Sequence, residues 1–366
     1  MTLRTVPPTR PVTVLDCGTR HLAFLRRTAS ILVCATLLPV TASAQVRIDV
    51  ELNQTALDAG LTEADVEDPV NDIIASELKL DGVTGFLDSM AKAQAMANKG
   101  MGADYASNIK KFEVGGSVSS ALNGAGFSFK KGQETLPQGG FAAHVTLMGG
   151  INLGLMASKK KAFGKRFRLY GNGLYMPLPG GEAFGGTMYN MGAHLQVKIV
   201  NGADAKVTEW GGIDITTGFE YAGYQLNLKR DLPLDAPIEG GEVTWTASGD
   251  YGLAATATSI PIEVSTNVRV AIMTGYLGGA LDIYTGSSDL QADLRGPIKG
   301  TVKPALKNER LGDATLAFDA AGAPDAYVPR IFAGGQLAIG PLKGYGHLNV
   351  GFNQTYGGHL GGRLAW

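Results

Sequence analysis

The chain has 366 residues, of which 51 are glycine, with 32 basic and 33 acidic side chains and a mean hydropathy of only +0.05. A net charge of -1 excludes the basic balance expected of a nucleic-acid-binding protein. No apolar run approaches the about 20 residues that a membrane-spanning helix requires, which excludes a helical membrane bundle.

Residues 1–44 have the features of a secretory signal peptide. Arg26 and Arg27 precede the apolar run 31–40, and small residues then mark a signal-peptidase site formed by Ala42, Ala44 and Gln45, with Gln45 the first mature residue. Cleavage there removes both cysteines, so we expect neither disulfides nor thiolate metal sites in the mature chain. It also removes five arginines and one aspartate, which leaves 27 basic and 32 acidic residues and a net charge of -5.

Residues 45–108 are predicted to be helical. The range 61–80 opens on Thr62 and Asp65, a capping-box pattern, and continues with apolar residues at helical spacing. A second helix, rich in alanine and methionine, is expected over 86–98, before Gly100 and Gly102. Neither helix is long enough to form a core alone. The segment is therefore a periplasmic element packed on the rest of the chain, a plug inside it, or a disordered lead-in.

Residues 109–366 change to a period of two, which is typical of strands. In 262–273, apolar residues alternate with Glu263, Ser265, Asn267 and Arg269, and the range 141–155 alternates in the same way. Around Ala222-Gly223 the apolar parity slips by one, which predicts a bulge or a tight hairpin. Segments rich in proline and glycine, 177–186, 231–241 and 296–308, are expected to be loops. We predict about 12–14 strands in total.

The last residues of the chain form a strand with one apolar face. Counting back from the terminal Trp366, this face carries Leu364, Gly362, Leu360, Gly358 and Tyr356. The pattern resembles the C-terminal assembly signal of bacterial outer-membrane barrels, with Trp366, Leu364 and Leu360 at its apolar positions. It departs from that signal at Gly362 and Gly358, where larger side chains are usual. The resemblance implies that the barrel-assembly machinery of Gram-negative bacteria is a partner.

Strand length favours a transmembrane β-barrel over a soluble sandwich, which also alternates. Ranges such as 141–155 and 262–273 reach the 9–11 residues needed to cross a bilayer, whereas soluble strands average about five or six. Aromatic residues near segment ends suit interfacial girdles: Trp210, Tyr221, Trp245, Tyr276, Tyr284 and Trp366. We therefore expect an all-β, antiparallel barrel over 109–366, located in the outer membrane and in contact with its lipid.

Charged residues on the polar face should line the lumen of this barrel. The candidates are Arg166, Arg168, Arg269, Arg330, Glu263, Asp282, Lys343 and Arg363. They either pair across a closed or water-filled lumen, or their arginines form a basic ladder that faces acidic residues and orients a polar solute. The mature histidines, His144, His194, His347 and His359, are expected to point inward without a catalytic motif. We predict no enzyme activity and no cofactor or metal.

Three functions are compatible with these features. The first is a passive channel or porin-like transporter for small solutes, because the predicted inner face is polar. The second is a closed barrel with a structural, adhesive or antigenic role. The third is a carrier of hydrophobic molecules, which would resemble the long-chain fatty-acid transporters and use the apolar residues 86–97 as a plug. The oligomeric state is left open.

Overall fold

The structure is a computed structural model that describes residues 43–78, 82–106, 111–124, 139–156, 162–181, 183–205, 207–302 and 306–366. The chain divides into two compact units, Met1–Leu38 and Pro39–Trp366, and all described residues lie in the second. The predicted signal peptide, including Ala42, therefore lies almost entirely outside the described residues. Among those residues, no helix is long and apolar enough to cross a membrane.

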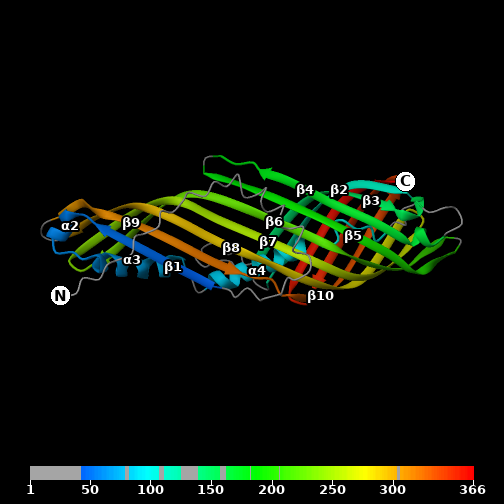
Figure 1. The fold of residues 1–366 in the computed structure, drawn as a ribbon, viewed down its shortest axis with the longest axis horizontal. Helices are drawn as coiled ribbons and strands as arrows, with labels where there is room; N and C mark the ends of the chain where they lie inside the picture. Colours follow the sequence, from blue (N-terminus) through cyan, green and yellow to red (C-terminus); the bar gives the residue numbers. More distant parts are fainter. Residues whose placement is uncertain are drawn as a thin grey trace. The chain divides into compact units, whose positions relative to one another are not determined.

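Twelve strands of the described chain form one antiparallel sheet (Figure 1). The strands are β1 (Ser43–Leu52), β2 (Phe112–Asn123), β3 (Gly140–Asn152), β4 (Phe167–Leu178), β5 (Phe184–Asp204), β6 (Thr208–Ile238), β7 (Gly241–Val270), β8 (Met273–Val302), β9 (Leu306–Gly322), β10 (Tyr327–Ile339), β11 (Leu342–Gly351) and β12 (Thr355–Ala365). The helices are α2 (Gln54–Asp58), α3 (Glu63–Leu78) and α4 (Val83–Ala97), with short 3-10 turns at Leu153–Met156 and Ala162–Arg166.

Ten of these strands close into a ring. Strands β2 to β7 follow one another in order, β7 pairs with β8, and β8 continues through β10 and β11 to β12. The ring is sealed where β12 pairs with β2, from Thr355 opposite Asn123 to Ala365 opposite Glu113. Closure removes the free sheet edges that would otherwise expose unpaired backbone groups. The predicted antiparallel barrel fold is confirmed.

The outer surface of the ring is apolar over a limited height. On β7, exposed apolar side chains run from Ile260 to Val270, about the 9–11 residues that a tilted transmembrane strand requires. Farther along the same face, the exposed residues are Asp250, Ser248 and Thr246. The other ring strands repeat the apolar exposure at Val118, Leu147, Leu169, Met191, Leu277, Ile331, Leu348 and Leu360.

Strands β6, β7 and β8 continue far beyond the ring. Strand β6 has 31 residues and would span about 100 Å at ~3.3 Å per residue. Past Leu228 it no longer pairs with β5, and past Ile283 strand β8 exchanges β10 for β9, which in turn pairs with β1. We call this five-stranded part the extension: β1, β9, and residues 229–238, 241–250 and 288–302. In Figure 1 it lies at the end opposite the C-terminus.

The extension has its own apolar core. Helix α3 packs across it between β1 and β6, the two edges of this part of the sheet. The core contains Val66 and Val70 from α3 and Trp245, Leu294 and Leu316 from the strands, all buried. Helix α3 begins with the predicted capping box, in which the Asp65 carboxylate accepts a hydrogen bond from the backbone N–H of Thr62 at 2.8 Å.

Several sequence predictions were wrong. Residues 45–108 are not wholly helical, because their first part is strand β1, which completes the extension by pairing with β9. The expected loops 231–241 and 296–308 belong mostly to β6, β7, β8 and β9. The slip of the apolar parity at Ala222-Gly223 marks neither a bulge nor a hairpin, because β6 pairs with β5 there without interruption. The inner face becomes apolar there because Tyr224 belongs to the core around α4.

The aromatic girdle was also predicted only in part. Trp210 and Trp366 are exposed, as interfacial residues would be. Trp245, Tyr276 and Tyr284 are buried instead, the first in the core of the extension and the other two in clusters inside the ring. A position near the end of a segment does not indicate which face of the strand carries the side chain.

Candidate functional site

Residues 83–106, which we call the plug, occupy the lumen of the ring. Helix α4 packs against the ring strands β2, β3, β7, β8 and β12, and its N-terminal end, with Val83 and Leu87, also packs against β9 of the extension. Its residues from Met90 to Ala97 are almost all buried, and so are residues 98–106 that follow it. The lumen is therefore filled, over the described residues, by a separate segment of the same chain.

Glycines in the wall make room for the plug. A Cβ atom added at Gly140 of β3 would overlap the backbone of Ser89, and one at Gly322 of β9 would lie 2.8 Å from Leu87 Cβ. At Gly357 of β12 it would lie 2.9 Å from Met96 Cγ. Real Cβ atoms do not approach other atoms this closely, so the α4 backbone requires glycine at Gly140 and Gly322, and the Met96 side chain packs closely on Gly357.

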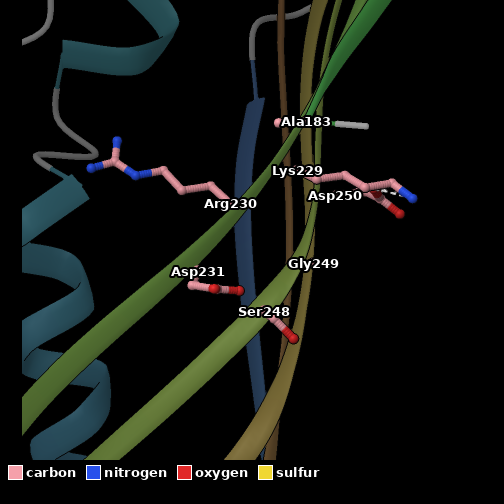
Figure 2. A pocket seen from close by; sticks show the side chains of 7 residues that line it. All are labelled: Ala183, Lys229, Arg230, Asp231, Ser248, Gly249 and Asp250. Carbon is pink, nitrogen blue, oxygen red and sulfur yellow. Dashed lines mark ion pairs between the residues drawn. The ribbon is translucent and has the colours of Figure 1, made fainter. Parts of the chain in front are cut away.

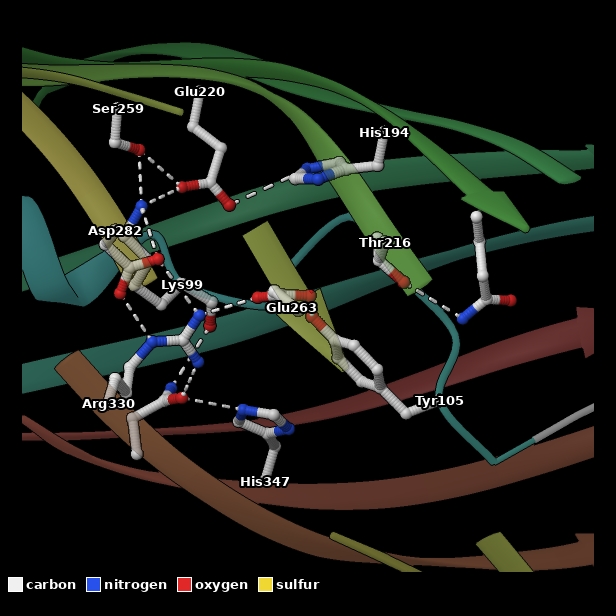
Figure 3. Close-up of polar contacts among 12 residues, drawn as sticks. Lys99, Tyr105, His194, Thr216, Glu220, Ser259, Glu263, Asp282, Arg330 and His347 are labelled. Carbon is white, nitrogen blue, oxygen red and sulfur yellow. Dashed lines mark hydrogen bonds and ion pairs between the residues drawn. The ribbon is translucent and has the colours of Figure 1, made fainter. Parts of the chain in front are cut away.

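A network of buried charges joins the middle of the plug to the wall. Lys99 Nζ lies 2.5 Å from Glu220 Oε2 and 3.9 Å from Asp282 Oδ1, and it also donates to the Ser259 hydroxyl. Figure 3 shows these side chains converging on the lysine from β6, β7 and β8. The lysine is completely enclosed by them, because its side chain has no exposed area.

Arg330 of β10 forms the second half of this network. Its guanidinium donates to Asp282 at 2.7 and 3.2 Å, to Glu263 at 2.6 Å and to Asn349 at 2.5 Å. Glu263 also accepts a hydrogen bond from the Tyr105 hydroxyl of the plug at 2.7 Å (Figure 3). Two cations and three carboxylates are thus buried together, and two of the contacts that hold them, those of Lys99 and Tyr105, come from the plug.

A second buried contact holds the far end of the plug. Arg363 Nη1 of β12 lies 3.3 Å from Asp104 of the plug and 3.5 Å from Glu113 of β2. The three side chains are almost completely buried. Close by, Asn267 of β7 donates to the backbone carbonyl of Tyr105 at 2.9 Å. The plug is therefore fixed to the wall at two levels of the lumen.

The remaining predicted lumen charges are dispersed. Arg168 is buried and donates to Gln196 at 2.7 Å, with Asp214 at 3.6 Å. Arg166 ends a 3-10 turn and is half-buried, Lys343 is half-buried, and Arg269 is exposed and pairs with Glu209 at 2.8 Å. The predicted basic ladder of Arg166, Arg168, Arg269 and Arg330 does not form, because its ends lie where β7 and the 3-10 turn leave the lumen.

All four mature histidines lie inside the ring, as predicted. His347 and His359 stack with ring centroids 4.4 Å apart, and Tyr105 of the plug stacks on His347 at 5.4 Å. His144 exchanges a hydrogen bond of about 3 Å with Gln94 of α4. Within the described ranges, no group of three histidine, cysteine, aspartate or glutamate side chains is arranged to hold a metal ion.

The other predicted site residues lie on strands. Leu360, Leu364 and Trp366 are exposed on the outer face of β12 and at its end, and the Trp366 carbonyl accepts a hydrogen bond from the Lys111 N–H at 2.7 Å. Of the expected cleavage residues, Ala44 and Gln45 belong to β1, opposite Ala320 and Asp319.

Sequence reasoning missed the lumen residues that belong to the plug. Gln94, Lys99, Asp104 and Tyr105 stand in or directly after the predicted helix 86–98, and nothing in their spacing indicates partners that lie 50 or more residues away. The available signal was the pair Lys99 and Asp104 in a glycine-rich, otherwise apolar stretch.

One pocket lies at the base of the extension. Its volume is about 440 Å³, and it is lined by Ala183, Lys229, Arg230, Asp231, Ser248, Gly249 and Asp250. Figure 2 shows Lys229 and Arg230 leaving β6 in opposite directions, with Lys229 paired to Asp250 at 4.0 Å. The pair is largely exposed and separated from the plug network, so we do not assign the pocket to the same site.

Comparison with known proteins gives one family match. The family model described as Lsa36-like matches residues 41–366, and no curated protein matches the chain. Among solved structures, the chain is similar to a FadL homologue from Pseudomonas aeruginosa, with 10% identity over 77% of this chain and 99% of that one and a TM-score of 0.23. It is also similar to the translocator domain of the autotransporter NalP from Neisseria meningitidis, with 9% identity, coverage of 83% and 98%, and a TM-score of 0.26. It is similar as well to the outer membrane protein Omp33 of Acinetobacter baumannii, with 9% identity over 70% of this chain and 98% of that one and a TM-score of 0.22. At these TM-scores the structural likenesses carry no argument about function.

Proposed function

The chain belongs to the Lsa36-like family, and we propose that it is an outer-membrane transporter of small solutes whose own plug keeps the lumen closed between transport events. The membrane location rests on the ring, whose exposed apolar band on β7, from Ile260 to Val270, has the height of a bilayer crossing. A permanently open porin is not proposed, because the plug fills the lumen.

The contact between Lys99 and its carboxylate partners, Glu220 and Asp282, carries this proposal. Buried ion pairs are an expensive way to make a permanent core, because desolvation offsets most of their attraction and apolar side chains often serve better. Charged groups in a lumen remain favourable when the plug moves, because water can then solvate them. The buried charges between the plug and the wall are therefore suited to an interface that separates and becomes hydrated when the plug moves.

A closed barrel with a structural or surface role is the second candidate. It is favoured by the way the plug is held, with glycine contacts at Gly140, Gly322 and Gly357 and structured chain on both of its sides. In this view the buried charges only fix the register of the plug in the wall. The two candidates differ in whether the plug ever leaves the lumen.

Conductance measurements separate them. The mature chain, Gln45 to Trp366, is refolded and placed in planar bilayers in potassium chloride, alongside a variant whose plug is replaced by a glycine-serine linker of equal length. We expect rare, brief openings from the mature chain and steady steps from the linker variant. If the linker variant keeps its strand circular dichroism and heat-modifiable migration but stays silent, the lumen is not a pathway and the transporter proposal fails.

A reversible staple supplies the matched control. In the variant Met96→Cys with Gly357→Cys, the new sulfur at residue 96 would lie near the 2.9 Å position of Met96 Cγ, close to the about 3 Å between a disulfide sulfur and the opposite Cβ. The mature chain has no other cysteine. Oxidation should abolish the brief openings and reduction should restore them, whereas Met96→Cys alone, which keeps Gly357, should not respond. Openings that persist after oxidation would show that solutes do not need the plug to move.

A further inference from the structure

The described N-terminal and C-terminal strands meet opposite ends of the lumen. Among the described strands, β1 pairs with β9 alone, in the extension. The plug begins beside the end of β9, where the Ala323 N–H donates to Asp88 at 2.9 Å. It ends beside Arg363, near the last residue of the chain. The polypeptide thus runs through the ring from the extension to the C-terminal rim before the first barrel strand, β2, begins.

The two rims of the ring differ in how far the chain projects from them. At the C-terminal rim three connections are short, at 205–207, 271–272 and 340–341, and a fourth, between β3 and β4, covers residues 153–166. The opposite rim carries the extension and the longer connection between β2 and β3. Outer-membrane barrels have short turns on the periplasmic side and long loops outside. The exposed face of the extension is also polar, with Asp231, Asp250 and Asp313 among its residues, so it lies in water rather than in lipid.

We propose that the N-terminal segment crosses the outer membrane through its own barrel. Residues 45–82 then lie on the outer surface as part of the extension, residues 83–106 remain in the lumen, and residues from Lys111 onward enter the barrel from the periplasm. The ring closes around a segment of 15 helical residues and the short stretch after it, with no room for a folded extension to pass. Residues 45–82 therefore cross as an unfolded chain and fold outside.

The apolar core of the extension retains the segment outside once it has crossed. Val50 of β1 and Val66, Val70 and Ile74 of α3 become buried only when these elements join β6 to β9. Burial of apolar side chains drives such docking, and in the mature chain the β1–β9 ladder adds backbone hydrogen bonds from Gln45 to Leu52. The plug is thus anchored at its N-terminal end by the folded extension and at its C-terminal end by strand β2.

Cysteine labelling on intact cells tests this topology without depending on transport. The full chain, with Cys17 and Cys34 changed to alanine, carries one new cysteine at Glu51 in β1, Glu242 in β7 or Val207 in the turn before β6, all of which are exposed. A membrane-impermeant maleimide is applied to a Gram-negative host before and after lysis. We expect Glu51→Cys and Glu242→Cys to react fully on intact cells and Val207→Cys to react only after lysis.

Each other pattern overturns the proposal. Reaction of Val207→Cys alone on intact cells would reverse the orientation. Reaction of Glu242→Cys without Glu51→Cys would place the N-terminal strand elsewhere and exclude threading. Protection of all three, or reaction of all three, would exclude a sided barrel. Heat-modifiable migration verifies that each variant has folded, and Asp49→Cys and Thr244→Cys replace any that has not. A protein that shows the expected labelling but no conductance, with or without its plug, would refute the transport proposal and would not contradict the threaded topology.

Discussion

Replacing Arg330 by methionine should strongly destabilise the barrel. The guanidinium has no exposed area and donates four hydrogen bonds, two to Asp282, one to Glu263 and one to Asn349. Methionine fills a similar volume but leaves two buried carboxylates without their main cation. Glu263 would keep only Tyr105, and Asp282 would keep Tyr284 at 3.2 Å and Lys99 at 3.9 Å.

The expected loss follows from this burial. Removing one partner of a buried ion pair costs about 3–5 kcal/mol, because the remaining charge is neither solvated nor compensated. The matched control is Arg310→Met in the extension, where the guanidinium also contacts a carboxylate twice, Asp313 at 2.6 and 2.8 Å, but is more than half exposed. A solvated pair of this kind contributes only about 0–1 kcal/mol.

Equilibrium unfolding in urea, from lipid vesicles and followed by tryptophan fluorescence, measures both variants. Arg330→Met combined with Glu263→Gln and Asp282→Asn should recover most of the loss, because the stranded charges are then gone. If Arg330→Met unfolds no earlier than Arg310→Met, the lumen around residue 330 is wet, and the view of a closed, dry network is refuted.

Three further outcomes are expected. Gly140→Ala should lower the free energy of unfolding by about 1–3 kcal/mol and raise the basal conductance, because the new methyl group displaces α4. Gly344→Ala, where no atom lies within 4 Å of the new Cβ, should change neither quantity, and equal effects of the two substitutions would contradict the steric explanation. Trp245→Ala, which empties a completely buried site, should cost about 3–5 kcal/mol and expose the extension to limited proteolysis while the ring stays resistant; simultaneous cleavage of both would contradict an independent core. The hydrogen bond from the Thr62 hydroxyl holds the pKa of Asp65 below its ordinary value. The contribution of this cap to stability is therefore present above the unfolded-state pKa of Asp65 and is lost as the pH falls through its folded-state pKa. Thr62→Val should raise the pKa of Asp65 in an NMR titration, and an unchanged pKa would exclude the capping box as the cause of the shift.

The ring was predictable because its strands alternate with a period of two. In 262–273, the outward Ile262 and Val264 and the inward Glu263 and Ser265 lie on the faces that the pattern predicts. Lipid outside and a polar lumen inside require apolar and polar side chains at alternate positions. The sequence of a single strand is therefore enough to predict which side chains point outward. The end of β7 was not readable, because Arg269 continues the pattern after the strand has reached the rim.

The extension was not predictable from composition. Residues 231–241 contain Asp231, Pro233, Asp235 and Pro237. These residue types indicate a loop rather than a strand that forms hydrogen bonds with a neighbour on each side. In the extension β6 is an edge strand, and proline is tolerated where the backbone nitrogen faces away from the neighbouring strand. The alternating Leu234, Ala236 and Ile238 were the remaining signal, and they are the residues that enter the core.

The plug contacts were unreadable for a different reason. Lys99 and Glu220 are separated by 121 residues, and the ion pair exists only because the ring closes around the plug. The strand pattern places Glu220 on the inner face, but Lys99 by itself has the appearance of an ordinary surface charge. Closure of the ring converts these residues into an interior network, and closure is a property of the whole sheet rather than of any segment.

Strands β6, β7 and β8 pass from the ring into the extension without a break, and this continuity has a mechanical consequence. A pull on the extension along the strand axes loads many backbone hydrogen bonds of the ladders in parallel, in shear. Bonds loaded together must fail together, whereas a flexible hinge would let the extension swing and peel. Tension applied at its tip is therefore transmitted to the ring, where the same strands carry Glu220, Glu263 and Asp282 against the plug.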